Sequence, residues 1–304
     1  METQSAYEKK LVEKFNEKGL SAKTITLYMR NLQMLNDNKP IRSLTFLKDK
    51  DKIKQILQKY QPNTQRNFYI TICSITKAMN QPKIHKLYYD DLNESNKTIK
   101  EQESKGLKTE KQEKNWIEWD DVLAIREDLK DKVSSIKSKK ITATQYDTML
   151  KYVVLSLYTW IAPRRNTDFT EMYIVKKVPN TERNYYETDT QKFHFNKFKT
   201  AKTDGPVTVD IPIELQQVLK QYLKYYSNKE LEEKPLLLSS SGKMLNGSNS
   251  ITRILNNVFK KNISSTMLRH SYLSSKYGNL KDEMEKDAHD MSHSVSTQQG
   301  IYVK

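Results

Sequence analysis

A stretch of 22 residues with almost no apolar side chains divides the sequence in two. It runs from Asn93 to Lys114, has the sequence NESNKTIKEQESKGLKTEKQEK, and mixes charges of both signs. Such a segment has too few apolar groups to offset the entropy lost on packing. We therefore predict a charged linker over residues 93–114, one domain at 1–92 and another at 115–304. A chain of 304 residues has the length of about two domains.

The region before this stretch has apolar residues at helical spacing. They fall into four groups: Tyr7, Leu11 and Phe15; Ile25, Tyr28, Leu32 and Leu35; Ile53, Ile56 and Tyr60; Phe68, Ile72, Ile75 and Met79. This period predicts a bundle of about four short helices. Ser21 and Asn63 are the expected N-caps of the second and fourth helices, because their side chains can accept hydrogen bonds from free backbone N–H groups.

The region after the stretch alternates between helical and strand-like patterns. Helical patterns fall near 119–130, 144–161, 213–226, 249–260, 265–277 and 281–290, and strand-like patterns at 171–178, 184–199 and 206–211. Helices that flank one small antiparallel sheet make this part α+β, and the whole chain mainly α.

The chain is strongly basic. Its formal net charge is +15 and its pI is about 9.4. Residues 1–90 alone hold 17 basic and 8 acidic side chains, so the excess is concentrated near the N-terminus. A charge of this size favours a polyanion such as nucleic acid as the partner.

Cysteine content and hydropathy exclude several classes of protein. Cys73 is the sole cysteine, which excludes an intrachain disulfide and a cysteine-based metal cluster, and we expect its side chain to be buried. No apolar run approaches the roughly 20 residues that cross a bilayer, and METQSAYEKK lacks the apolar stretch of a signal peptide. We therefore expect a soluble intracellular protein without a membrane partner.

Three segments of the second region hold residues suited to phosphodiester chemistry. Cleavage without a metal needs cations on the non-bridging oxygens, a nucleophile in line, and an acid for the leaving oxygen. YTWIAPRRNTDF carries Arg165, with Asp168 three residues later, and STMLRHSYLSSKYG carries Arg269. MSHSVSTQQGIYVK places His293 nine residues before Tyr302.

This ordered set resembles the tyrosine recombinase (integrase) family. In that family an R-x-x-D/E motif precedes R-H-x-x-L/A-S/T, and G-H-x-S-x-x-T-x-x-Y follows. The resemblance covers the whole second region, and the basic bundle ahead of it is similar to the family's helical core-binding domain. It implies that Arg165 and Arg269 hold the phosphate, that His293 hydrogen-bonds the same phosphate, and that Tyr302 is the nucleophile. Arg164, beside Arg165, remains an alternative for the first position.

The family also uses a lysine on a β-hairpin as the general acid. The segment FNKFKTAKTDGPVTVDIP offers Lys199 and Lys202 ahead of a TDG turn. We favour Lys202, which is nearer the turn, and keep Lys199 as the alternative.

The sequence departs from the family pattern at three places. Thr266 stands where a His or Lys is usual, three residues before the second arginine, so the base that deprotonates the tyrosine is His293, His270 or a water. Ser292 replaces the usual Gly before the third-motif histidine. The chain stops two residues after the tyrosine, where relatives usually continue into a helix that docks on a neighbouring protomer. Either the sequence is trimmed there or its protomer contacts differ.

The resemblance implies a site-specific recombinase that works as a homo-tetramer on double-stranded DNA. Strands would be cleaved and rejoined through a 3'-phosphotyrosine intermediate, without metal, ATP or a small-molecule cofactor. The Lys, Asn and Ile bias, with APRR at the first motif, is similar to integrases that insert or excise genomes of viruses and mobile elements of eukaryotes. The alternatives are a type IB topoisomerase and a catalytically inactive DNA-binding regulator.

Overall fold

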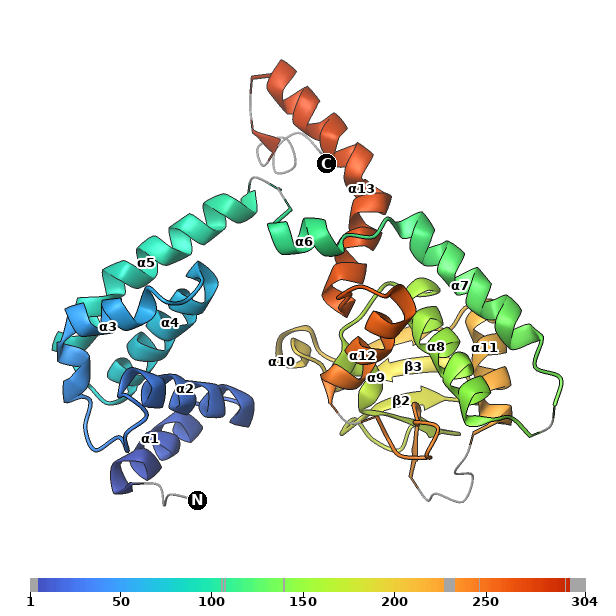
Figure 1. Ribbon diagram of the computed structural model, residues 1–304, viewed down its shortest axis with the longest axis horizontal. Helices are drawn as coiled ribbons and strands as arrows, with labels where there is room; N and C mark the ends of the chain where they lie inside the picture. The colour runs from blue at the N-terminus through green and yellow to red at the C-terminus, as the bar shows by residue number, and fades with distance from the viewer. Residues whose placement is uncertain are drawn as a thin grey trace. The chain divides into compact units, whose positions relative to one another are not determined.

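The computed structural model describes residues 5–104, 106, 108–138, 140–226, 233–245, 247–292, 294 and 295. The chain divides into two compact units, residues 1–108 and 109–304, each with its own hydrophobic core. Figure 1 shows the first unit as a set of helices and the second as helices around a small sheet. The mainly helical α+β class is thereby confirmed. None of the described helices combines the length and the apolar character that crossing a membrane requires.

The first unit is a helical bundle. Its elements are α1 (Ala6–Glu17), α2 (Ala22–Leu35), the 3-10 helix η1 (Thr45–Lys48), α3 (Lys50–Leu57), α4 (Pro62–Ala78) and α5 (Pro82–Ser104). Ser21 caps α2 as predicted, because its hydroxyl accepts a hydrogen bond from the backbone N–H of Thr24. The prediction of Asn63 as the cap of α4 is wrong. Gln61 holds that position and Pro62 starts the helix, where its missing N–H needs no partner.

The core of this unit draws on every helix. It contains Phe15 of α1, Leu32 of α2, Ile53 of α3 and Tyr88 of α5, all fully buried. Cys73 of α4 is buried here as predicted, and burial raises the pKa of its thiol to about 11. A thiol in this state is a packing group with little thiolate at neutral pH.

A buried carboxylate joins the start of α1 to the rest of the bundle. Glu8 accepts hydrogen bonds from the backbone N–H groups of Ser5 at 2.7 Å and Ile41 at 3.2 Å, and from Nε2 of Gln33 at 3.4 Å. Burial by itself raises the pKa of this carboxyl, but the hydrogen bonds outweigh burial, so that the pKa lies below its usual value.

The segment expected as a linker is mostly helical, and that expectation is wrong for residues 93–104. α5 continues to Ser104 and packs along α4, and α6 covers Glu110–Asn115. Ile99 is only 7% exposed, and Arg66 of α4 donates from Nε to Asn96 at 2.5 Å. Contacts with α4 therefore stabilise the second half of α5, whose polar composition alone does not predict a helix.

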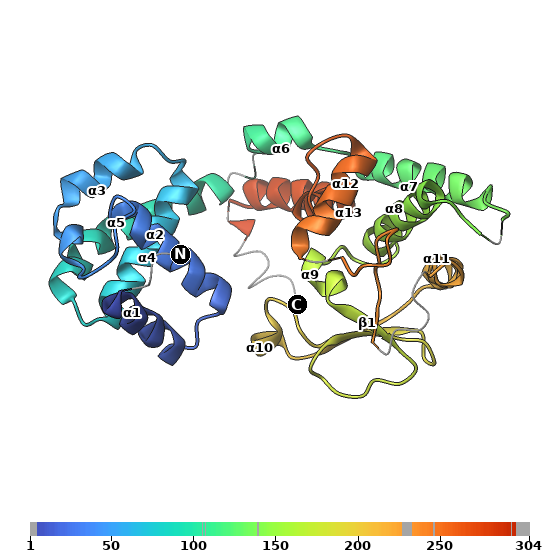
Figure 2. The same cartoon turned by 60° about the horizontal axis from the view of Figure 1, so that its bottom comes forward.

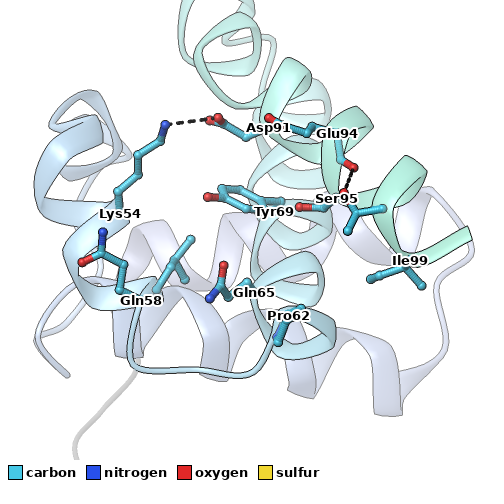
Figure 3. A pocket seen from close by; sticks show the side chains of 11 residues that line it. Lys54, Gln58, Pro62, Gln65, Tyr69, Asp91, Glu94, Ser95 and Ile99 are labelled. Atoms are coloured by element: carbon cyan, nitrogen blue, oxygen red, sulfur yellow. Dashed lines mark hydrogen bonds and ion pairs between the residues drawn. The ribbon is translucent and has the colours of Figure 1, made fainter. Parts of the chain in front are cut away.

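A pocket of about 340 Å³ lies between α3, α4 and α5 (Figure 3). Asp91 of α5 forms ion pairs across it with Lys54 at 3.3 Å and Lys50 at 2.8 Å. Burial, followed by the charges of Asp91 and Glu94, raises the pKa of the Tyr69 phenol in its wall. The charges of this pocket are therefore balanced within the unit, and they fasten α5 to α3.

The second unit consists of helices packed against a small sheet. Its helices are α6, α7 (Trp119–Ser134), α8 (Ala143–Thr159), α9 (Asn166–Thr170), α10 (Ala201–Asp204), α11 (Ile213–Lys224), α12 (Ser248–Phe259) and α13 (Ser265–Asp290). The strands within the described residues are β1 (Met172–Val175), β2 (Asn184–Glu187), β3 (Lys192–Phe195), β4 (Val207–Asp210) and β5 (Lys234–Pro235). They lie in the order β4-β3-β2-β1-β5. Because β1 and β2 run parallel while the other neighbours are antiparallel, the sheet is mixed, where the sequence predicted an antiparallel one.

One face of the sheet packs against helices, with α7, α8 and α12 on that side (Figure 2). Along β3, Phe193 and Phe195 alternate with Lys192 and His194, so that the aromatic rings point to the core. Phe169 of α9 meets the two phenylalanine rings edge to face, with ring centres 6.0 and 5.8 Å away. These contacts fix α9 on the inner face of the sheet.

α13 is one helix of 26 residues, where the sequence predicted two helices ending at 277 and beginning at 281. Gly278 lies in its interior, where a glycine costs roughly 1 kcal/mol relative to alanine but does not forbid a helix. Met267 and Leu268 bury the first half of α13 in the unit, whereas most of the second half is exposed.

Candidate active site

Arg165 stands at the turn between α8 and α9, as the N-cap residue of α9, with extended backbone angles of φ −76° and ψ 150°. Its side chain is half-buried. Within the described ranges its guanidinium group forms no hydrogen bond or ion pair. Five N–H donors in a planar fork are therefore open to an anion.

Arg164 is engaged by the protein itself. Its Nε donates to Oδ2 of Asp168 at 2.9 Å, and its guanidinium carbon lies 3.8 Å from the ring centre of Phe195 and 5.2 Å from that of Phe198. Burial raises the pKa of the Asp168 carboxyl, although Arg164 and Arg165 act in the opposite direction. An arginine held in this way fixes the turn, which favours Arg165 over its neighbour as the group that meets a ligand.

The two candidate lysines lie on the connection between β3 and β4. Lys199 follows β3 and Lys202 lies in the short helix α10, which ends at Gly205 with φ +72°. β3 and β4 form the expected antiparallel hairpin, but the longer connection holds the lysines beyond the paired strands. Both side chains are exposed and, in the described part of the chain, neither forms an ion pair.

Asn184, the first residue of β2, joins this connection to α9. Its Oδ1 accepts from the backbone N–H groups of Asn196 at 2.8 Å and Lys197 at 2.7 Å. Its Nδ2 donates to the carbonyl oxygens of Lys197 at 2.9 Å and Asp168 at 3.0 Å. All four hydrogen-bonding positions of the amide are used, and the side chain is 1% exposed. We call residues 196–206, which join β3 to β4 and carry Lys199 and Lys202, the lysine connection. The hydrogen bonds of Asn184 therefore fix the lysine connection to α9, the helix that Arg165 begins.

Tyr158 of α8 joins α9 to the start of α13. Its buried hydroxyl donates to Oδ1 of Asn166 at 2.7 Å, and the hydroxyl of Ser265 interacts with the same phenol. Asn166 donates from Nδ2 to Oγ1 of Thr252 in α12 at 2.9 Å. Burial raises the pKa of the Tyr158 phenol far above its usual value, so this tyrosine is a hydrogen-bond donor and not a nucleophile.

Arg269 lies one helical turn after Ser265 on α13. Its side chain is half-buried and makes no hydrogen bond or ion pair with another described residue. Thr266 and His270 are exposed on the same turn. The buried side chains of Tyr158 and Asn184 therefore join the elements that carry the two arginines and the lysine connection.

His293 and Tyr302 lie outside the described residues. The last residue of the α13 cap, Met291, follows Arg269 by 22 positions, or roughly 33 Å of helix. Within the described ranges, no group of three or more His, Cys, Asp or Glu side chains is arranged to hold a metal ion.

No local pattern in the sequence indicates the buried contacts under the site. Asn184 stands in the strand sequence NYYE, and Tyr158 is one of 18 tyrosines. Their side chains form hydrogen bonds with partners 8 to 16 residues or more away in the chain, and no local sequence pattern predicts such contacts. Of these three residues, Asn166 could have been suspected from the sequence, because it directly follows the two arginines of the first motif.

Comparison with known proteins gives a weak structural likeness. No family model matches the chain, and no curated protein matches its sequence. Among solved structures it is similar to XerA recombinase, with 15% sequence identity and a TM-score of 0.37, over 96% of this chain and 91% of that chain.

Proposed function

We propose that this chain is a tyrosine recombinase that cleaves and rejoins DNA. The observation that supports it best is that two guanidinium groups, without a hydrogen bond or ion pair among the described residues, and the lysine connection stand on elements joined by buried hydrogen bonds. The two arginines occur in the order of the first two family motifs. Arg165 and Arg269 have protein neighbours that hold their backbones and leave their charged groups for a phosphate.

The reaction balances without an added reagent. The Tyr302 oxygen attacks the scissile phosphorus, the bond from phosphorus to the 5' oxygen breaks, and a 3'-phosphotyrosyl link forms. Arg165 and Arg269 stabilise the charge on the non-bridging oxygens, and His293 hydrogen-bonds the same phosphate. Lys202 gives a proton to the leaving 5' oxygen, and a base takes the phenol proton. Attack by a 5' hydroxyl reverses every step and rejoins the strand.

Lys199 is the alternative acid, and the base is His293, His270 or a water. Strand exchange requires several copies on two duplexes, which we propose as a tetramer that integrates or excises a viral or mobile-element genome. The first unit, with its excess of basic over acidic residues, would hold duplex DNA as a core-binding domain.

A nicked suicide duplex tests this proposal. Wild-type protein is expected to form a covalent protein–DNA band on a denaturing gel, and Tyr302→Phe and Arg269→Ala are expected to form none. Arg183→Ala is the matched control, because Arg183 is exposed, pairs with exposed Glu233 at 2.7 Å and lies with its guanidinium carbon 4.7 Å from the ring centre of Tyr173, on a surface that the proposed mechanism does not use. Absence of the band with wild-type protein across cognate and random duplexes would favour the inactive regulator, provided that the protein binds DNA.

The topoisomerase alternative predicts a different product. A type IB topoisomerase relaxes supercoiled plasmid and rejoins the same strand, whereas a recombinase joins strands of two duplexes. Mixing two duplexes of different length and looking for a joined strand of new length separates these outcomes.

A further inference from the structure

We propose that Arg164 is a positioning residue, which holds the lysine connection at a fixed place relative to Arg165. This step rests on the proposed function, because it concerns where the general acid of that reaction stands. The guanidinium carbon of Arg164 lies 3.8 Å from the ring centre of Phe195 and 5.2 Å from that of Phe198. Both distances fall within the roughly 6 Å over which a cation is attracted to the face of an aromatic ring.

The two rings belong to different parts of the second unit. Phe195 is the last residue of β3 and is fully buried in the core. Phe198 belongs to the lysine connection and packs partly buried against the same core, whereas Lys197 and Lys199 on either side of it are exposed. Phe198 therefore ties the connection to the body of the unit, and Arg164 lies against both rings.

A buried carboxylate fixes the other side of the Arg164 guanidinium. Its Nε donates to Oδ2 of Asp168 at 2.9 Å, and Asp168 is 2% exposed. The attraction between a cation and an aromatic ring is stronger where water is excluded, so this stack resists displacement of Phe198. Since Arg165 follows Arg164 directly, the turn that carries Arg165 also sets the place of the Phe198 ring.

The backbone carries this placement on to the candidate lysines. The N–H of Ala201 donates to the carbonyl oxygen of Phe198 at 3.1 Å, at the start of α10. Among the described residues, no side chain of residues 199–205 forms a hydrogen bond or ion pair. The stack on Arg164 is therefore a side-chain anchor directly ahead of both candidate lysines, and its loss should let them move.

Arg164 and Asn184 hold neighbouring parts of the connection by different means. Asn184 accepts from the backbone N–H groups of Asn196 and Lys197, so it holds the start of the connection, whereas Arg164 holds the ring of Phe198. The planar guanidinium of an arginine can lie against a ring while its Nε keeps a hydrogen bond, and a lysine ammonium cannot do both. Arg164→Lys should therefore keep the positive charge in place but lose the stack.

Single-turnover cleavage of a nicked suicide duplex tests this role. Phe198→Leu and Arg164→Lys are each expected to lower the cleavage rate roughly tenfold, because the acid is no longer held at the leaving oxygen. Phe198→Tyr keeps the ring face, so its rate should stay within about twofold of wild type. On a substrate with sulfur in place of the leaving 5' oxygen, all three variants should match wild type, because a thiolate leaves without a proton. A loss of equal size on both substrates, or no loss at all, overturns the proposal.

Tyr225→Leu is the matched control, because it removes the ring of another cation–aromatic pair of the second unit. Nζ of Lys224 lies 5.4 Å from that ring centre, and the Tyr225 hydroxyl donates to the carbonyl oxygen of Ser138 at 3.0 Å. This pair stands at the C-terminal end of α11, on the other side of the unit from α10 in both views (Figure 1 and Figure 2). The control should cleave both substrates at the rate of wild type. A control as slow as Phe198→Leu would contradict a specific role for the stack.

The double variant, Arg164→Lys with Phe198→Leu, tests whether the two residues act through one contact. Its cleavage rate should be no lower than that of the slower single variant, because the second substitution removes a contact that is already lost. Two independent effects would instead multiply to about a hundredfold, and that result overturns the stack as their common cause.

Hydrogen exchange of residues 196–206 distinguishes failure of this proposal from failure of the proposed function. Exchange of these amides should rise roughly tenfold in Phe198→Leu and Arg164→Lys, and should stay unchanged in Tyr225→Leu. If wild type cleaves DNA and exchange does not rise, positioning by Arg164 is wrong while the proposed function stands. If wild type cleaves no duplex, the proposed function fails, and the exchange measurement still decides whether the stack holds the connection.

Discussion

The buried layer and the open rim of the candidate site use polar residues in opposite ways. In the layer, Arg164, Asp168 and Asn184 have protein partners at hydrogen-bonding distance and hold the backbone. On the rim, Arg165 and Arg269 have no hydrogen-bonding or ion-pair partner among the described residues. The internal hydrogen bonds of the layer therefore hold the backbone in place, while the charged groups of the rim stay available for a ligand. The layer should govern stability, and the rim should govern reaction.

The largest expected effect is on the rim. Arg165→Ala and Arg269→Ala should each lower the rate of covalent DNA cleavage roughly a thousandfold, as expected for loss of a group that stabilises the transition-state charge. Their unfolding temperatures should stay within a few degrees of wild type, because neither guanidinium forms a hydrogen bond or ion pair with another described residue. Single-turnover cleavage and thermal unfolding measure the two effects. A variant that loses several degrees would place its arginine in the layer instead.

Asp168→Ala is the corresponding change in the layer. It leaves the mostly buried guanidinium of Arg164 without its carboxylate, which should cost about 2 to 3 kcal/mol of unfolding free energy. Asp204→Ala, on an exposed position of α10, is the control and should change the free energy by less than about 0.5 kcal/mol. All three tryptophans lie in the second unit, so urea unfolding followed by tryptophan fluorescence reports the relevant region. Equal effects of the two substitutions would remove the distinction between layer and rim.

Asn184→Ala tests whether the layer positions the rim. Loss of the amide should cost about 2 kcal/mol of stability and free the connection that carries Lys199 and Lys202. Cleavage of ordinary DNA should fall roughly tenfold or more. Activity should recover on a substrate with sulfur in place of the leaving 5' oxygen, because a thiolate leaves without a proton. Asn180→Ala is the control. Equal losses on both substrates would show that Asn184 acts on stability alone.

The smallest effect concerns the first unit, where Glu8 is also buried but has a lowered pKa. Its ionised form contributes stability above the unfolded pKa of about 4.3, and this contribution is lost as the pH falls through the lower folded pKa. Glu8→Gln should therefore cost about 1 kcal/mol at neutral pH, and this cost should shrink as the pH falls below the unfolded pKa of about 4.3. Hydrogen exchange of α1 and α2 measures it. A cost independent of pH would mean that shape, and not charge, holds Glu8.

The sequence predicted the parts of this molecule that local patterns encode. Helical period located α1, α2, α7 and α8, and strand alternation located β1 and β4 close to their observed bounds. Motif spacing selected Arg165 and Arg269, and the structure leaves their guanidinium groups free within the described residues. Whether they hold a phosphate stays a prediction.

The failures share one physical cause, which is that contacts distant in sequence override local preference. The polar second half of α5 stays helical because Ile99 and Asn96 meet neighbours on the bundle. α13 passes through Gly278 because a single glycine costs less than the rest of the helix contributes. Asn184 is invisible in the sequence since its four hydrogen bonds depend on how β2, α9 and the lysine connection meet.

The burial of Cys73 makes the chain convenient for chemical probing. With its thiol pKa near 11 and its side chain in the bundle core, Cys73 should react slowly with maleimides and disulfide reagents while the protein is folded. Cysteines introduced at surface positions would then carry a label or a crosslink with little background. Leu280→Cys, at an exposed position of α13, would place such a label away from the core of the second unit.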